Sequence, residues 1–170
     1  IESARDHEGN LRGIPSGFTD LDRITAGWQK SDLVILAARP GMGKTAFVLS
    51  MARNIAVDFN IPLAIFSLEM SSIQLVTRLI SSETQLPADK LKKGNLESYE
   101  WEQLNAKIGK LVDAPLYIDD TPALSIFELR AKCRRLKAQH GIQFIIIDYI
   151  QLMSGGTDNK GNREQAISTI

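Results

Sequence analysis

The stretch Ala38-Arg39-Pro40-Gly41-Met42-Gly43-Lys44-Thr45 decides how this 170-residue chain is interpreted. An apolar run over residues 33–38 leads into it, and a helical pattern begins at Ala46. A strand, a tight glycine turn and a helix in this order form a phosphate-binding loop, whose backbone N–H groups face the phosphates. In such a loop the lysine reaches the β- and γ-phosphates and the next hydroxyl holds Mg²⁺. Residues 38–46 are therefore the predicted nucleotide-binding segment, with Lys44 in a catalytic role and Thr45 as a metal ligand.

The match is to a looser form of this motif, because Ala38 stands where the first glycine usually lies. Gly41 and Gly43 still let the backbone turn its N–H groups inward, since they carry no Cβ. A structural turn that only resembles a phosphate loop is the alternative. We favour phosphate binding because the strand–turn–helix context is also met.

Composition limits the classes of protein to which the chain can belong. Its hydrophobic content of 44% and charged content of 24% are those of a soluble globular domain. Lys plus Arg and Asp plus Glu both number 20, so nucleic-acid binding would need a local patch or a ring of subunits. No apolar run could span a bilayer, and no secretory signal is visible. The single cysteine, Cys133, excludes an internal disulfide and fits a reducing, cytoplasmic compartment.

Apolar runs and helical periodicities alternate along the chain. Strands are expected at residues 33–38, 63–68, 116–118 and 144–148. Helices are expected over residues 46–58 and 98–112, and others begin near Thr19, Ser71, Ser125 and Arg163. This alternation predicts an α/β fold, a parallel sheet with helices on both faces. Residues 1–12 are expected to be a linker or arm, and residues 154–162 a glycine-rich loop.

Helix starts and buried stripes follow from residue spacing. Thr19 with Asp22 and Ser125 with Glu128 have the spacing of capping boxes. The expected apolar contacts are Leu21, Ile24 and Trp28 in the first helix, Ile73, Val76, Leu79 and Ile80 in the helix after Ser71, and Ile126, Leu129, Cys133 and Leu136 in the helix after Ser125.

Acidic residues follow several of the expected strands, at the edge where α/β sheets bind ligands. Asp148 ends a buried strand, where a bare carboxylate is costly unless a cation pairs with it. Its predicted partner is the Mg²⁺ of a bound nucleotide, and the alternative is an acid that merely caps a strand end. Asp119 and Asp120 could touch the water shell of the metal, but a turn set by Asp-Thr-Pro explains them equally well.

A hydrolase also needs a group that orients or deprotonates the attacking water. Many phosphate-loop ATPases place a glutamate directly after the strand aspartate, but here that position is Tyr149. Glu69 is the best candidate for the catalytic base, because it ends the strand that follows the phosphate-loop helix. The alternative is an acid that stabilises a helix N-terminus. The basic cluster between Arg130 and Lys137 is interpreted as a solvated face, with a subunit contact or DNA patch second.

A series of motifs in a particular order carries a family resemblance. The segments are Gly13-Ile14-Pro15-Ser16-Gly17-Phe18 with Leu21-Asp22, the phosphate loop, Ser67-Leu68-Glu69-Met70, Ile118-Asp119-Asp120-Thr121-Pro122, Lys132-Cys133-Arg134-Arg135-Leu136 and Asp148-Tyr149-Ile150-Gln151-Leu152. From about Gly13 to the end, the chain resembles the C-terminal motor domain of the DnaB family of bacterial replicative DNA helicases. The phosphate loop alone is shared with very many NTPases, whereas the Ser-Leu-Glu-Met and Asp-Tyr-Ile-Gln-Leu segments are much more specific.

The resemblance implies a RecA-like fold and a homohexameric ring that uses ATP and Mg²⁺ to move along single-stranded DNA. It implies Glu69 as the catalytic base, primase and a helicase loader as partners, and a further domain before residues 1–12. It also implies that residues 13–170 are an incomplete motor domain, with the sensor glutamine, the arginine finger and the main DNA-contacting loops beyond Ile170. Arg78, Lys160 and Arg163 are candidate DNA or subunit contacts. The rivals are another RecA-like ATPase, such as a recombinase or a signalling ATPase, and a nucleotide-binding assembly module.

Overall fold

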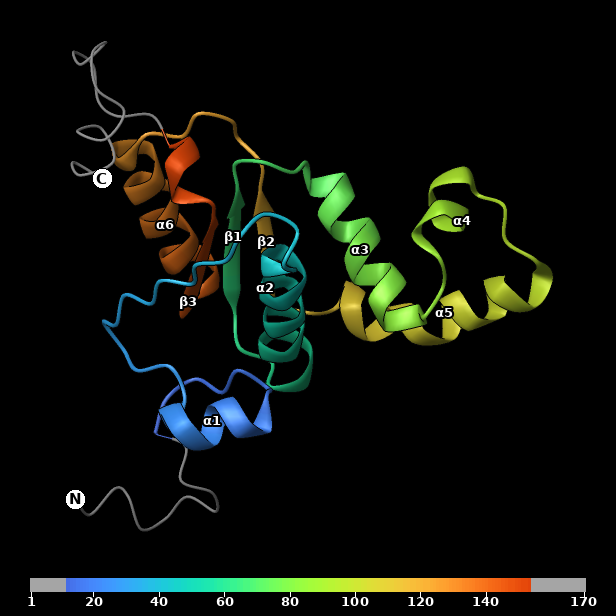
Figure 1. Cartoon of the computed structure of the whole chain (residues 1–170), viewed down its shortest axis with the longest axis horizontal. Coiled ribbons are helices and arrows are strands. Elements are labelled where there is room, and N and C mark those ends of the chain that lie inside the picture. The colour runs from blue at the N-terminus through green and yellow to red at the C-terminus, as the bar shows by residue number, and fades with distance from the viewer. Residues whose placement is uncertain (1–11, 154–170) are drawn as a thin grey trace.

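The structure is a computed structural model and describes residues 12–153. Its centre is a parallel sheet with the strand order β2-β1-β3, in which β1 is Leu63–Ser67, β2 is Leu116–Asp119 and β3 is Phe144–Asp148. Leu63 pairs with the first residue of each neighbouring strand, so the strands are level with one another. Their carboxyl ends therefore meet at one edge, the upper edge in Figure 1.

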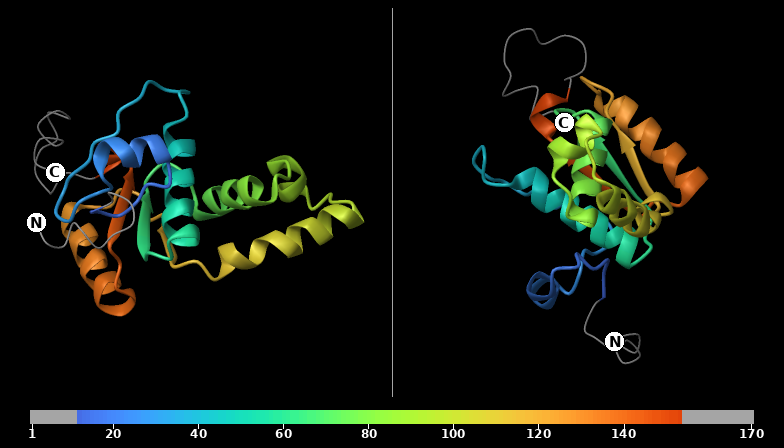
Figure 2. Two further views of the ribbon diagram at one scale, coloured as in Figure 1. Left: turned by 90° about the horizontal axis from the view of Figure 1, so that it is seen from below. Right: turned by 90° about the vertical axis from the view of Figure 1, so that its right-hand side faces the viewer.

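The central strand β1 is buried over its whole length, as a continuous apolar run predicts for a strand covered on both faces. Leu63 and Ile65 belong to the core on one face, with α2 (Lys44–Arg53). Ala64 and Phe66 belong to the core on the other face, with α6 (Ile126–His140). Figure 2 shows these helices on opposite sides of the sheet. The predicted α/β fold with helices on both faces is confirmed.

The two covering helices agree closely with the sequence. The helix predicted over residues 46–58 begins two residues earlier, as α2, and its last turn is a π-helix, η2 (Asn54–Asp58). Its buried residues are Val48, Leu49, Met51, Ala52, Ile55 and Ala56. The Ser125 hydroxyl caps α6 by accepting from the Glu128 N–H at 3.3 Å, and Gly141 ends the helix in the left-handed conformation. The predicted capping box is confirmed.

Three helices extend to one side of the sheet, on the right in Figure 1. They are α3 (Ser72–Thr84), the short α4 (Ala88–Lys93) and α5 (Ser98–Val112). The predicted buried stripe of α3 is partly wrong, because Ile73 and Val76 are exposed while Leu75 and Leu79 are buried. Leu75 and Leu79 are four residues apart and so share the face that packs against the core. Ile73 lies on the opposite side of the helix, and Val76 lies at the margin of the buried face, where it is 40% exposed.

The strand predicted at residues 33–38 is absent. This segment has no regular structure and is exposed, with Leu33 at 86% and Ile35 at 81% exposure. Backbone N–H and C=O groups form a strand only when a neighbouring strand pairs with them, and no strand among residues 12–153 pairs with this segment. The prediction is therefore wrong, because an apolar run indicates a buried strand only where a neighbouring strand lies beside it.

The segment around α1 (Thr19–Thr25) also corrects a prediction. Thr19 does not cap this helix, because Phe18 is the N-cap residue and no side chain caps it. The Asp22 carboxylate instead accepts hydrogen bonds from the N–H of Ser16 at 2.7 Å, the Ser16 hydroxyl at 2.6 Å and the N–H of Gly17 at 3.1 Å. Asp22 therefore stabilises the loop before α1 and does not form a capping box in the first turn of that helix.

Aromatic residues fasten this N-terminal segment to α2. The rings of Phe18 and Phe47 are stacked with centroids 4.9 Å apart, and Trp28 packs against the core as predicted. The Asn54 side chain donates to the Ser16 carbonyl at 3.3 Å. Ile24 is exposed, so its predicted apolar contact is wrong. None of the described helices is both long and apolar enough to cross a membrane.

A salt bridge joins α2 to the extended helices. Arg53 donates two hydrogen bonds to the Glu83 carboxylate of α3, at 2.7 and 3.1 Å, and also pairs with Asp58. The hydrogen bond from Arg53 and its charge hold the pKa of Glu83 below its ordinary value, although burial opposes them. The two side chains are mostly shielded from water, so this pair is worth more than an exposed one.

We expect Glu83→Gln to lower the free energy of unfolding by about 1–2 kcal/mol at pH 7. Because the pKa of Glu83 is lower in the folded state, its stabilisation is complete above the ordinary glutamate pKa and is lost as the pH falls through the lowered value. Urea unfolding at a series of pH values should therefore show the two curves converging in acid. Glu102→Gln, at an exposed position of α5, is the control. A constant difference between wild type and Glu83→Gln down to acid pH would contradict this.

Candidate active site

The phosphate-loop segment lies at the carboxyl edge of the sheet, where α2 begins (Figure 1). Gly41 and Gly43 have φ values of 78° and 86°, a conformation that side chains rarely adopt. The Met42 N–H donates to the Arg39 carbonyl at 3.2 Å and closes the turn between them. Gly43 is the N-cap of α2, and no side chain caps this end. The first N–H groups of α2 are thus left for an anion, which the helix dipole also favours.

The carboxylate of Asp148 organises the site. The residue is only 6% exposed, and the Thr45 hydroxyl donates to its Oδ2 at 2.9 Å. Lys44 Nζ lies 3.6 Å from Oδ1. A buried carboxylate needs such partners, because leaving it unpaired costs several kcal/mol. The structure thereby brings Lys44 and Thr45 to Asp148, which lies 103 positions after Thr45 in the sequence.

Tyr149 is a site residue that sequence reasoning missed. Lys44 Nζ lies 4.3 Å from the centre of its ring, a cation–π contact. In the sequence Tyr149 stands where many phosphate-loop ATPases have a glutamate, and it belongs to the Asp-Tyr-Ile-Gln-Leu segment, but neither pattern assigns its side chain a contact. An aromatic ring next to the strand aspartate was the available signal, but which cation it would meet depends on the fold. Lys44 is held from two sides, by Asp148 and by Tyr149.

Glu69 follows the central strand, between the ends of β2 and β3. It is exposed, and its carboxylate has no hydrogen bond or ion pair to any other residue in the range 12–153. The buried Ser67 hydroxyl donates to the Met70 carbonyl at 2.7 Å and accepts from the Met70 N–H at 3.2 Å. Glu69 therefore sits in a closed turn with its carboxylate available to a ligand or a water.

The acidic pair after β2 makes protein contacts. Asp119 forms a salt bridge with Lys132 of α6 and accepts from the Thr121 N–H at 3.0 Å. Burial raises the pKa of Asp119, but the hydrogen bonds from Lys132 and Thr121 outweigh it and hold that pKa below its ordinary value. Asp120 accepts from the Ser72 N–H at 2.7 Å. These contacts are those of a structured turn, the second of the two interpretations of the sequence.

The remaining candidates lie apart from this edge or outside the described residues. Arg78 is exposed on α3, and Lys160 and Arg163 lie outside the described residues. In the basic cluster of α6, Lys132 binds Asp119, whereas the other cations are exposed, as a solvated face predicts: Arg130, Arg134, Arg135 and Lys137.

A metal ion at this site would depend on the ligand that it accompanies. Within residues 12–153 no group of three or more His, Cys, Asp and Glu side chains could hold a metal by itself. Magnesium is usually bound by one or two protein ligands together with substrate phosphates and water. The Thr45 hydroxyl and the Asp148 carboxylate, already 2.9 Å apart, fit that pattern.

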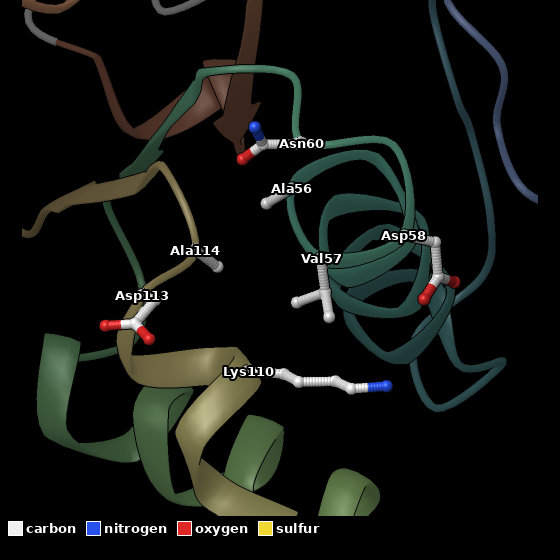
Figure 3. Close-up of a pocket in the computed structure, with 7 residues that line it drawn as sticks. All are labelled: Ala56, Val57, Asp58, Asn60, Lys110, Asp113 and Ala114. Atoms are coloured by element: carbon white, nitrogen blue, oxygen red, sulfur yellow. The ribbon is translucent and has the colours of Figure 1, made fainter.

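An open hollow of about 490 Å³ lies elsewhere, beside the amino ends of β1 and β2 (Figure 3). It is lined by Ala56, Val57, Asp58, Asn60, Lys110, Asp113 and Ala114. Parallel α/β sheets bind ligands at the carboxyl ends of their strands. This hollow is therefore not part of the candidate active site.

Comparisons with known proteins agree with this geometry. The family described as "DnaB-like helicase C terminal domain" matches residues 13–170. Over the whole chain, 49% of residues are identical to the replicative DNA helicase DnaB of Geobacillus stearothermophilus and 48% to the replicative DNA helicase DnaC of Bacillus subtilis. The chain spans 37% of the length of each relative.

Solved structures give the same result. A DnaB-like replicative helicase, studied with its primase interactions, has a TM-score of 0.87 and 36% identity over 99% of this chain and 40% of its own. A second solved ATPase domain has a TM-score of 0.88 and 34% identity over 98% of this chain and 60% of its own.

The Thr45–Asp148 contact can be tested without any ligand. Thr45→Val keeps the shape of the side chain but removes a donor from a buried carboxylate, so we expect a loss of about 1–3 kcal/mol in the free energy of unfolding. Thr45→Ser keeps the hydroxyl and should remain near wild type. Urea unfolding in the presence of EDTA measures both. Equal stability of Thr45→Val and wild type would mean that the hydroxyl does not bind Asp148.

Proposed function

Because the chain belongs to the DnaB-like helicase C-terminal domain family, we propose that it is the ATP-hydrolysing motor segment of a replicative DNA helicase. In this proposal a homohexameric ring of the whole protein hydrolyses ATP, moves along single-stranded DNA and unwinds the duplex. The observation that carries the proposal is the grouping of Lys44, Thr45 and Asp148 where α2 begins at the sheet edge.

The phosphates of ATP are bound by the turn of the phosphate loop, residues 38–46. Its N–H groups and the positive end of α2 attract negative charge, and Lys44 leaves Asp148 to reach the β- and γ-phosphates. Thr45 and Asp148 would hold Mg²⁺, which would neutralise charge on the phosphates. Glu69 orients a water in line with the γ-phosphate, since its carboxylate is exposed beside this edge. Catalysis here is mainly positioning and charge stabilisation.

The proposed activity also depends on neighbouring subunits, DNA and partner proteins. An arginine from the neighbouring subunit would add a factor of about 10³ or more to the rate, so hydrolysis would depend on ring contacts. Arg78, Lys160 and Arg163 are proposed as DNA or subunit contacts. Primase and a helicase loader are proposed partners, supported for primase by the interactions reported for the related solved helicase. The proposed location is the replication fork in the cytoplasm.

We expect single-stranded DNA to stimulate ATP hydrolysis by the full-length protein that contains this chain. Lys44→Ala should abolish nucleotide binding and hydrolysis, because the loop loses its cation. Glu69→Gln should bind ATP normally but hydrolyse it at least about 100-fold more slowly, as expected for the loss of a general base. Steady-state ATPase assays and fluorescent-nucleotide binding measure these effects.

Each result separates two interpretations. Hydrolysis that is indifferent to DNA would favour a signalling or assembly ATPase of the same fold. Full activity of Glu69→Gln would contradict its role as the base.

The role of Asp148 predicts a metal-dependent change in affinity. Asp148→Asn keeps an acceptor for Thr45 but loses the negative charge. We expect it to bind ATP about tenfold more weakly or worse with Mg²⁺, whereas its affinity in EDTA should not fall. Isothermal titration calorimetry with and without Mg²⁺ measures both affinities. An equal loss under the two conditions would mean that Asp148 does not act through the metal.

A further inference from the structure

Glu69 lies in a short connection whose two ends are both fixed. At the strand end, the hydroxyl of Ser67, which is 2% exposed, makes both hydrogen bonds to Met70 described above. At the helix end, the N–H of Ser72, the first residue of α3, donates to Asp120 Oδ2 at 2.7 Å. The residues between these two anchors include Glu69 itself.

The N-terminal cap of α3 does not supply an acceptor for the Ser72 N–H. Ser71 and Gln74 form a reciprocal capping box, with the Gln74 N–H on the Ser71 hydroxyl and the Ser71 N–H on the Gln74 side chain. The Ser72 N–H has no role in that box. Asp120, 48 residues away, therefore supplies the hydrogen-bond acceptor for this N–H. Its negative charge is also favourable at a helix N-terminus.

The turn that carries Asp120 is itself fixed by contacts of its neighbours with α6. Its neighbour Asp119 forms the salt bridge to Lys132, and Lys132 also donates to the Thr121 hydroxyl at 2.7 Å. The turn after β2 is thus fastened to α6, on the opposite face of the sheet from α2. The hydrogen bond from the Ser72 N–H lowers the pKa of Asp120, so the carboxylate is ionised at neutral pH.

The sheet order separates Asp120 from the proposed metal position. β1 lies between β2 and β3, so the ends of β2 and β3 are two strand spacings apart, or about 10 Å. Glu69, after β1, stands between them. Asp120 is thus placed to hold the turn that carries Glu69 rather than to meet the same metal as Asp148.

We propose that Asp120 is a positioning residue for ATP hydrolysis, which holds the first turn of α3 and thereby keeps Glu69 aimed at the γ-phosphate. This inference rests on the proposed role of Glu69 as the catalytic base. A displacement of about 1 Å of a catalytic group can cost about 100-fold in rate, so one hydrogen bond at this turn matters.

Four variants of the full-length protein test the contact from both sides. Asp120→Ala removes the acceptor, and Ser72→Pro removes the donor without breaking the helix, because proline is well accepted at the first helical position. Ser71 has φ −68° and ψ 154°, a conformation that a following proline allows. Asp120→Asn keeps an acceptor, and Ser72→Ala keeps the N–H.

We expect Asp120→Ala and Ser72→Pro each to lower kcat by about 10- to 100-fold, with KM and nucleotide affinity nearly unchanged. Asp120→Asn and Ser72→Ala should stay within about threefold of wild type, since each keeps the hydrogen bond. Asp113→Ala, at an exposed aspartate after α5, is the matched control and should be silent. Adding Asp120→Ala to Glu69→Gln should cost nothing further, because the residue acts through Glu69.

The outcomes also separate this inference from the function on which it rests. If Glu69→Gln is inactive while Asp120→Ala and Ser72→Pro are fully active, the positioning role is overturned and the base assignment stands. A further loss in the double variant would likewise overturn it, as would a loss of Mg²⁺-dependent affinity in Asp120→Asn, which would mark Asp120 as part of the metal site. Full activity of Glu69→Gln would overturn the base assignment and the positioning role together.

Discussion

The buried carboxylate of Asp148 is the constraint on which the rest of the site depends. A charge at the end of an interior strand is tolerated only with partners, and the fold supplies the Thr45 hydroxyl and the Lys44 ammonium. Both come from the first turn of α2, so satisfying this one carboxylate fixes where that helix begins relative to β3. The same contacts leave the first N–H groups of α2 facing the sheet edge, without a side-chain cap.

The parallel sheet arranges the other groups around that point. Because β1 is central, Glu69 emerges between Asp148 on one side and the Asp119–Asp120 turn on the other. Asp148 is bound to Lys44 and Thr45 of the phosphate loop, and the Asp119–Asp120 turn is bound to α6 and α3. The exposed Glu69 carboxylate thus lies between two groups that are held by other residues. This arrangement orients Glu69 while leaving its carboxylate free to bind a ligand.

Much of this could be predicted from the sequence. Continuous apolar runs gave β1, β2 and β3, and the Ser125–Glu128 spacing gave the start of α6, because these signals are local. Residues 33–38 carried the same apolar signal, but a strand also needs a partner, which no local pattern can supply. The hydrogen-bond partners of Asp22 and Asp120 could not be predicted for a related reason. Their hydrogen-bond partners are chosen by how loops fold back on helices, and residue spacing does not encode that.

The most direct test is a crystal structure of the protein with Mn²⁺ in place of Mg²⁺ and a non-hydrolysable ATP analogue. Anomalous scattering would locate the metal without assumptions about its ligands. We predict a metal peak about 2.1 Å from the Thr45 hydroxyl, beside Asp148, with Lys44 moved onto the phosphates. A peak coordinated by Asp119 or Asp120 instead, with Lys44 still on Asp148, would contradict this description of the site.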